Sequence, residues 1–151
     1  MTELTRLVPP PPDPPPVGEW GLELPADYRD LIATYGPGTL AGLGLLVPGH
    51  PNEFVDLVRQ TERQRWALQY LIDEGIELPY APGELLPWGI DESGNVVWWL
   101  TQGDWPVVAN EARGEGWLRY EGGAVSFLVA ILSGALVSDF LAIEGDDFVA
   151  S

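Results

Sequence analysis

The stretch LLPWGIDESGNVVWWL, residues 85–100, decides the fold. Its two apolar ends have the length of β-strands, and the polar segment Asp91–Asn95 between them has the composition of a turn, with Gly94 able to adopt a positive φ angle. The second apolar end, Val96–Leu100, is uninterrupted, which is typical of a strand that is buried on both faces. The stretch therefore predicts a β-hairpin whose second strand lies centrally in a sheet.

Further elements surround this hairpin on both sides. Apolar residues at 3–4 spacing predict helices, and short apolar runs between turn signals predict strands. The expected helices are 25–35, 52–74 and 124–136, and the other expected strands are 39–47, 105–110 and 116–120, the last two joined by the charged hairpin Glu111–Glu115. Because helices come first and last, with consecutive strands between them, we predict an α+β fold with a mainly antiparallel sheet and helices packed on one face.

Proline marks the beginning of the chain. Seven of the 15 prolines lie in Pro9–Pro16, a run that favours the extended polyproline II conformation. Such a run can serve as an SH3-type ligand, but no Lys or Arg flanks it closely, so we interpret it as a stiff arm on the domain. We expect a proline-rich N-terminal arm over residues 1–18, with the folded part starting near Trp20, a domain over 19–145 and an acidic C-terminal tail over 146–151.

The charge of the chain limits its partners. There are 23 acidic residues against seven arginines and no lysine, which gives a formal net charge of −16. A surface of this sign repels nucleic acid and anionic membranes and attracts a basic protein. Neither a signal peptide nor a stretch of about 20 apolar residues is present, so we expect a cytoplasmic protein.

Residues that carry chemistry are scarce. The chain has no cysteine, and its one histidine, His50, lies in a Pro-Gly-His-Pro turn without a second histidine to share a metal. The Asp91–Asn95 turn resembles the start of a calcium loop, but Gln102 stands where the bidentate glutamate would be required. We therefore expect a protein that is not an enzyme and holds neither cofactor nor metal.

Tryptophan is the more informative residue type, with seven in 151 residues. Trp98 and Trp99 are adjacent on a strand, so their indoles must point to opposite faces of the sheet. If the helices cover mainly one face, one of these indoles is exposed and available to a partner. The alternative is that the arm, loops or second helix cover that face.

Three segments together resemble the SUKH superfamily, which includes the Smi/Knr-type proteins. Leu24–Arg29 with Tyr35-Gly36 is similar to its opening Leu-Pro-x-Asp/Glu-Tyr helix, and Leu86–Asn95 resembles its strand and polar turn. The segment from Ser126 to Gly134 is similar to its closing helix. The resemblance covers roughly Leu24 to Leu136 and is closest to bacterial, actinobacterial branches, although Gly36-Pro37-Gly38 replaces the more usual Asn-Gly-Gly.

The resemblance implies an α+β domain that works by binding. Bacterial members are mostly immunity proteins that sequester toxins, often nucleases or deaminases, and fungal relatives regulate cell-wall synthesis. We accordingly expect a cognate basic toxin as the partner, and a monomer or weak homodimer; the alternative is a non-catalytic regulatory or scaffold protein. The candidate partner contacts are Asp91, Glu92, Asp104, Glu111 and Glu115, with Trp99, Trp105 and Trp117 as aromatic anchors.

Overall fold

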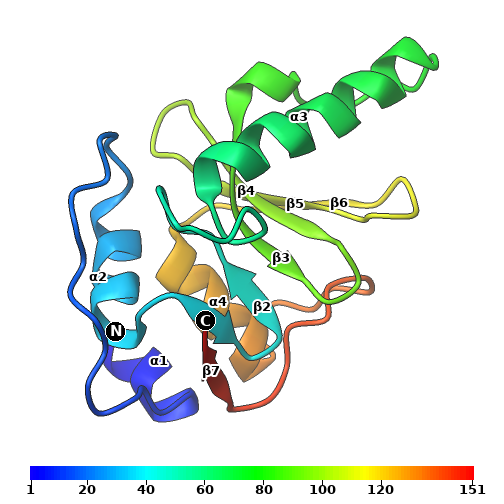
Figure 1. Cartoon of the computed structure of the whole chain (residues 1–151). Helices are drawn as coiled ribbons and strands as arrows, with labels where there is room; N and C mark the ends of the chain where they lie inside the picture. The colour runs from blue at the N-terminus through cyan, green and yellow to red at the C-terminus, as the bar shows by residue number, and fades with distance from the viewer.

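The hairpin predicted from residues 85–100 forms the middle of a seven-stranded sheet in the computed structural model, which describes residues 1–151 (Figure 1). The strand order is β6-β5-β4-β3-β2-β1-β7, and every neighbouring pair is antiparallel. The strands are β1 Gly38–Leu40, β2 Leu43–Leu45, β3 Leu85–Asp91, β4 Val96–Leu100, β5 Val107–Asn110, β6 Trp117–Tyr120 and β7 Phe148–Ala150. The helices are α1 Thr2–Leu7, α2 Ala26–Tyr35, α3 Leu57–Asp73 and α4 Ala124–Ser133, with a 3-10 turn at Pro82–Glu84. The predicted α+β class and antiparallel sheet are confirmed.

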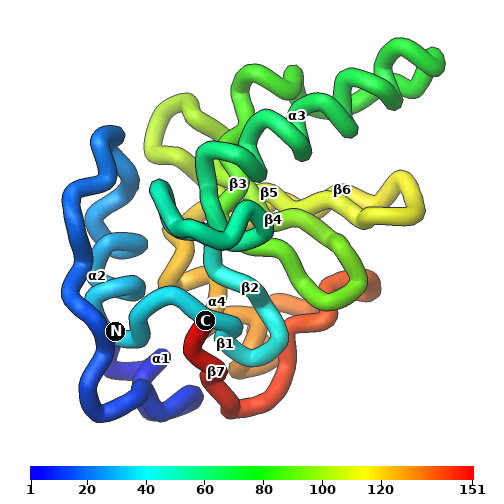
Figure 2. The backbone as a smooth tube through the Cα atoms, viewed as in Figure 1, coloured from blue at the N-terminus to red at the C-terminus, as the bar shows by residue number.

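Helices cover both faces of the sheet, so the prediction that they pack on one face is wrong. On β4, Val97 and Trp99 point into a core that includes residues of α1, α2 and α4. Val96, Trp98 and Leu100 point the other way, toward Leu68 of α3. Figures 1 and 2 show α3 on one side of the sheet and α4 on the other. The alternation of side chains along β4 was predictable from the sequence. Which face each helix covers depends on how the whole chain packs, and local sequence signals do not determine it.

The run 39–47 forms two strands instead of the one expected. Ala41 and Gly42 have φ angles of 50° and 87°, and they close a two-residue turn between β1 and β2. Two successive residues with positive φ are the geometry of a tight hairpin. The continuous apolar composition of the run concealed the turn.

α3 begins five residues later than predicted. Asp56 caps it, with its carboxylate accepting hydrogen bonds from the backbone N–H groups of Val58 (3.3 Å) and Arg59 (3.4 Å). Asn52, where the predicted helix starts, instead accepts from the N–H of Phe54 in the preceding turn. Phe54 and Val58 are exposed, as is Ile72 near the end of the helix.

The folded part begins at α1, well before the expected start near Trp20. Leu4 and Val8 are fully buried in the main core, and the Tyr35 hydroxyl donates to the carbonyl of Val8 at 2.6 Å. Residues 146–151 are likewise more than a tail, because β7 pairs with β1. Both chain ends were underestimated because each contributes a short element that is stable only when packed. No helix is both long and apolar enough to cross a membrane.

Two buried tyrosines predict a loss of stability in alkali. Burial raises the pKa of Tyr28 strongly and that of Tyr35 to about 12, against about 10 in the unfolded chain. The folded state therefore keeps protons that the unfolded state releases above about pH 10. The stability that this contributes is fully present below about pH 10 and is lost as pH rises toward the folded-state pKa, by about 1.4 kcal/mol per pH unit for each tyrosine.

Urea unfolding at successive pH values above about 10 measures this slope. Tyr28→Phe and Tyr35→Phe should each reduce the pH slope of the free energy of unfolding by the contribution of one proton. Tyr70→Phe, at an exposed position, is the matched control and should keep the native slope. A slope that is identical in all four proteins would contradict the prediction.

Candidate functional site

The candidate contact residues lie at two opposite ends of the sheet. Because successive turns of an antiparallel sheet alternate between its ends, the β3–β4 and β5–β6 turns share one end (Figure 1). These two turns touch, since the N–H of Ala112 donates to Oδ1 of Asn95 at 2.8 Å. The β4–β5 turn, with Asp104 and Trp105, lies at the other end beside Glu23–Pro25. The structure therefore brings together Glu92, Glu111 and Glu115, and it separates them from Asp104 and Trp105.

Asp91 is a structural residue, and its prediction as a partner contact is wrong. It is only 5% exposed and accepts four hydrogen bonds. One oxygen accepts from the N–H groups of Ser93 and Asn95, both at 3.0 Å. The other accepts from the Asn95 side-chain amide at 2.9 Å and from the N–H of Ala142 at 2.8 Å. Asp91 therefore fixes the β3–β4 turn and ties it to the segment that follows α4.

That segment, residues 138–147, crosses the end of the sheet. Near its start, Phe140 lies against Gly116 of the β5–β6 turn, and its carbonyl accepts from the Asn95 amide at 2.8 Å. Near its end, the N–H of Glu144 donates to the carbonyl of Ala41 at 2.9 Å. The segment thus spans the turns of three hairpins and adds its own acids to theirs.

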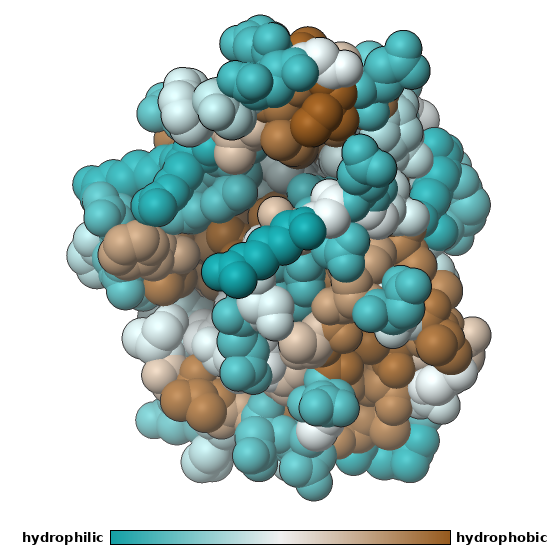
Figure 3. All heavy atoms as spheres, turned by 90° about the vertical axis from the view of Figure 1, so that its right-hand side faces the viewer, coloured by the Kyte–Doolittle hydropathy of each residue, from teal (hydrophilic) through white to brown (hydrophobic).

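We call the resulting surface the acidic end. It consists of the carboxylates Glu92, Glu111, Glu115, Asp139, Glu144, Asp146 and Asp147, all exposed except Glu111, which is half-buried. Arg113, in the β5–β6 turn, is the one basic side chain of these segments. Figure 3 shows the molecule from this side, with hydrophilic and hydrophobic residues intermixed, and Val137 beside the acidic segment is 80% exposed. Four of the seven carboxylates were missed, because the acidic composition of 139–147 was visible in the sequence but its return to the sheet was not.

The two adjacent tryptophans are both buried, which settles the alternative left open by the sequence. Trp99 is 0% exposed and lies against Tyr28, with ring centroids 5.0 Å apart, so its prediction as an anchor is wrong. Trp98 is equally buried on the face that α3 covers, and its indole N–H donates to Oδ1 of Asn110 at 2.6 Å. Trp105 and Trp117 are half-buried, so their surfaces are partly available to a partner.

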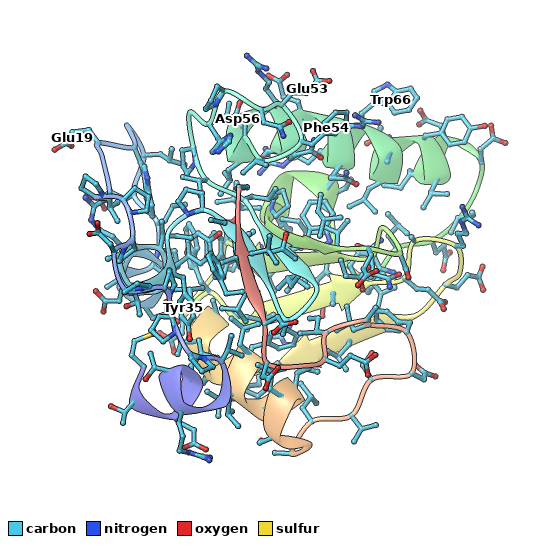
Figure 4. All side chains as sticks on the ribbon, turned by 60° about the horizontal axis from the view of Figure 1, so that its bottom comes forward. Glu19, Tyr35, Glu53, Phe54, Asp56 and Trp66 are labelled. Atoms are coloured by element: carbon cyan, nitrogen blue, oxygen red, sulfur yellow. The ribbon has the colours of Figure 1, made fainter.

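The most exposed aromatic side chains lie on or just before α3 and were not among the predicted contacts. Trp66 is 71% exposed, Phe54 61% and Tyr70 53%. Figure 4 shows Trp66 on the side of α3 that is turned away from the sheet. Trp66 lies on the side of α3 opposite its buried residues Leu57, Thr61 and Leu68.

Features expected of a small-molecule site are sparse. A hollow of about 320 Å³ lies between the β1–β2 hairpin and the start of α3, and Arg63 is the one charged side chain that lines it. The ring nitrogen Nδ1 of His50 accepts from the N–H of Asn52 at 3.1 Å within its turn. No group of three or more His, Asp or Glu side chains is placed to hold a metal ion.

The geometry defines an α+β protein with a charged end built on three hairpin turns. Comparison of the chain with known protein families, with curated proteins and with solved structures gives no match.

Proposed function

We propose that this chain is a cytoplasmic, non-catalytic immunity protein that binds a basic toxin and neutralises it by occluding its active site. The observation that carries the proposal is the acidic end, which presents seven carboxylates from three separate segments and one guanidinium. A nuclease or deaminase that acts on nucleic acid needs a basic surface for phosphate, and an acidic surface of comparable extent competes for it.

The construction of the acidic end suits a tight complex. Hydrogen bonds from Asn95 and Ala142 to Asp91 hold the hairpin turn and the acidic segment in place before a partner arrives. Carboxylates that are already positioned lose little conformational freedom on binding, and their summed field speeds association with a basic protein. Exposed Val137 and half-buried Trp117 offer apolar contact beside them.

The resemblance to the SUKH superfamily supports the same proposal. Its segments fall on α2, on β3 with the following turn, and on α4, all elements of the main sheet and core. In bacteria this superfamily consists mostly of immunity proteins. The regulatory alternative depends on the proline segment, residues 9–16, whose exposed members are Pro9, Pro12, Pro15 and Pro16. Deleting residues 1–18 would not separate the two functions, since it removes Leu4 and Val8 from the core. Substituting the exposed prolines leaves both core residues in place, and it should abolish partner recruitment while toxin binding persists.

Co-expression with the toxin-like domain encoded beside this gene tests the proposal. The native chain should rescue growth and form a complex at low salt. Reversing three exposed acids of the acidic end (Glu92→Arg, Glu115→Arg, Asp146→Arg) should weaken binding by about a hundredfold or more, because attraction becomes repulsion at the contact surface.

The matched control reverses three exposed acids outside this surface (Glu19→Arg, Glu23→Arg, Asp104→Arg), which changes the net charge equally. It should retain most of the affinity. Equal losses in the two variants would show that net charge, not the acidic end, attracts the toxin, and absence of any complex with the native chain would overturn the proposal.

A further inference from the structure

The outer face of α3 has the character of an interface although nothing in the chain covers it. α3 is seventeen residues long and lies on the outside of the molecule in Figures 1 and 2. Its buried stripe contains Leu57, Thr61 and Leu68. The residues on the opposite side of the helix, which we call the outer face, are Arg59, Glu62, Arg63, Trp66, Tyr70 and Asp73, and all six are exposed.

Aromatic rings occupy the centre of this face. Trp66 and Tyr70 are stacked, with ring centroids 5.9 Å apart and planes inclined by 24°, and they are 71% and 53% exposed. Large aromatics of this exposure on a well-formed helix are typical of interface anchors, since tryptophan and tyrosine dominate the energetics of protein contacts.

Charge is distributed unevenly along the helix. The first half, residues 57–65, carries three arginines and one glutamate, and these are three of only seven basic residues in the chain. Residues 66–77, the second half and the turn after it, carry Asp73, Glu74 and Glu77 and no base. Two of these three arginines, Arg59 and Arg63, lie on the outer face with the exposed aromatics, whereas Arg65 turns toward the sheet and its Nε donates to the carbonyl of Leu85 at 2.9 Å.

We propose that the outer face of α3 binds a second copy of this chain, with the two α3 helices antiparallel about a twofold axis at Trp66. In that arrangement Trp66 of one chain contacts Trp66 of the other. Arg59 and Asp73 each lie seven residues from Trp66, about two helical turns or 10.5 Å, on opposite sides of it. Arg59 of each copy therefore lies opposite Asp73 of the other, and the basic half of each helix faces an acidic half.

A second copy fits this face better than a different partner because the charge order is self-complementary. Twofold symmetric pairing is the commonest form of protein association and requires a surface of this kind. Both charged groups can also pair with a second chain. Arg59 contacts Asp56 through Nε alone, at 3.5 Å, and Asp73 accepts a hydrogen bond from Gln69 through one of its two oxygens, at 3.0 Å. The acidic end includes no residue of α3, so dimerisation and toxin binding are separate properties.

Sedimentation equilibrium of the full chain at fixed physiological salt tests the proposal. The native chain should dimerise reversibly. Trp66→Ala should raise the dimer dissociation constant at least about 30-fold, because each dimer loses both central anchors. Val137→Ala, which truncates an even more exposed apolar residue at the acidic end, should leave the constant unchanged.

A charge exchange tests the antiparallel register. Arg59→Asp and Asp73→Arg should each raise the dissociation constant roughly tenfold or more, because each places like charges opposite one another twice in the dimer. An equimolar mixture of the two variants should form a heterodimer, since the introduced aspartate then faces the introduced arginine, and the native pair is preserved. The double variant should dimerise like the native chain.

Three results would overturn the proposal. One is a native chain that stays monomeric up to its solubility limit, and another is a dimer that is indifferent to the α3 substitutions. The third is failure of the two single-charge variants to combine. Circular dichroism of each variant shows that it is folded, and the triple reversal at the acidic end should dimerise as the native chain does.

Discussion

Asp91→Ala is expected to lower the free energy of unfolding by about 3 kcal/mol, because it leaves buried donors without an acceptor. The carboxylate accepts four hydrogen bonds, and its principal partner Asn95 is only 3% exposed, so water cannot replace the lost acceptor there. Ala142, near the middle of the segment 138–147, loses its attachment at the same time. The midpoint temperature of thermal unfolding, Tm, should fall by about 2–4 °C for each kcal/mol of stability lost in a chain of this length.

Two variants make this prediction specific. Glu92→Ala removes the neighbouring exposed carboxylate and should change stability by no more than about 0.5 kcal/mol. Asp91→Asn keeps the shape of the side chain but turns an amide toward the donors of Asn95 and Ala142, so it should also destabilise. Equal stability of Asp91→Ala and Glu92→Ala would contradict the role of Asp91 as the residue that holds the acidic end together.

The elements that were predictable from sequence are those whose signals are local. The hairpin of residues 85–100 combines two apolar runs with a polar, glycine-containing turn, and Gly94 does have a positive φ angle of 85°. The β1–β2 hairpin was missed because its turn is only Ala41-Gly42 within an apolar run. The start of α3 was misplaced because Asn52 and Asp56 are both good caps, and only the packing of the preceding turn selects Asp56.

The candidate site was predictable only in part, because burial depends on which elements pack together. The exposed glutamates of the β3–β4 and β5–β6 turns were identified from the composition of the turns. Asp91 begins one of the same polar turns, yet it is buried because residues 138–147 pack back against that turn. Trp99 was expected to be an anchor if helices covered one face, and it is buried because both faces are covered. Trp66, by contrast, is exposed because the stripe of α3 that packs on the sheet lies opposite to it.

Leu4→Ala is expected to lower the free energy of unfolding by about 3 kcal/mol, within the range for a fully buried leucine. Leu4 is 0% exposed in the main core, and α1 packs against α4. A helix of six residues is not stable in isolation, so α1 forms because this leucine and Val8 are buried. Urea unfolding of the full chain measures the loss directly.

Glu3→Ala, on the exposed side of the same helix, is the matched control and should leave the free energy of unfolding nearly unchanged, because its pair with Arg6 is open to solvent. If the two variants were equally stable, α1 would contribute nothing to the core, and residues 1–18 would be the separate arm that their proline content predicts. A large difference means instead that the proline segment is fixed at its start by Leu4 and Val8 and passes Gly36 at the end of α2, where Pro15 lies too close for any side chain. The proline segment then acts as a strap that joins α1 to the domain.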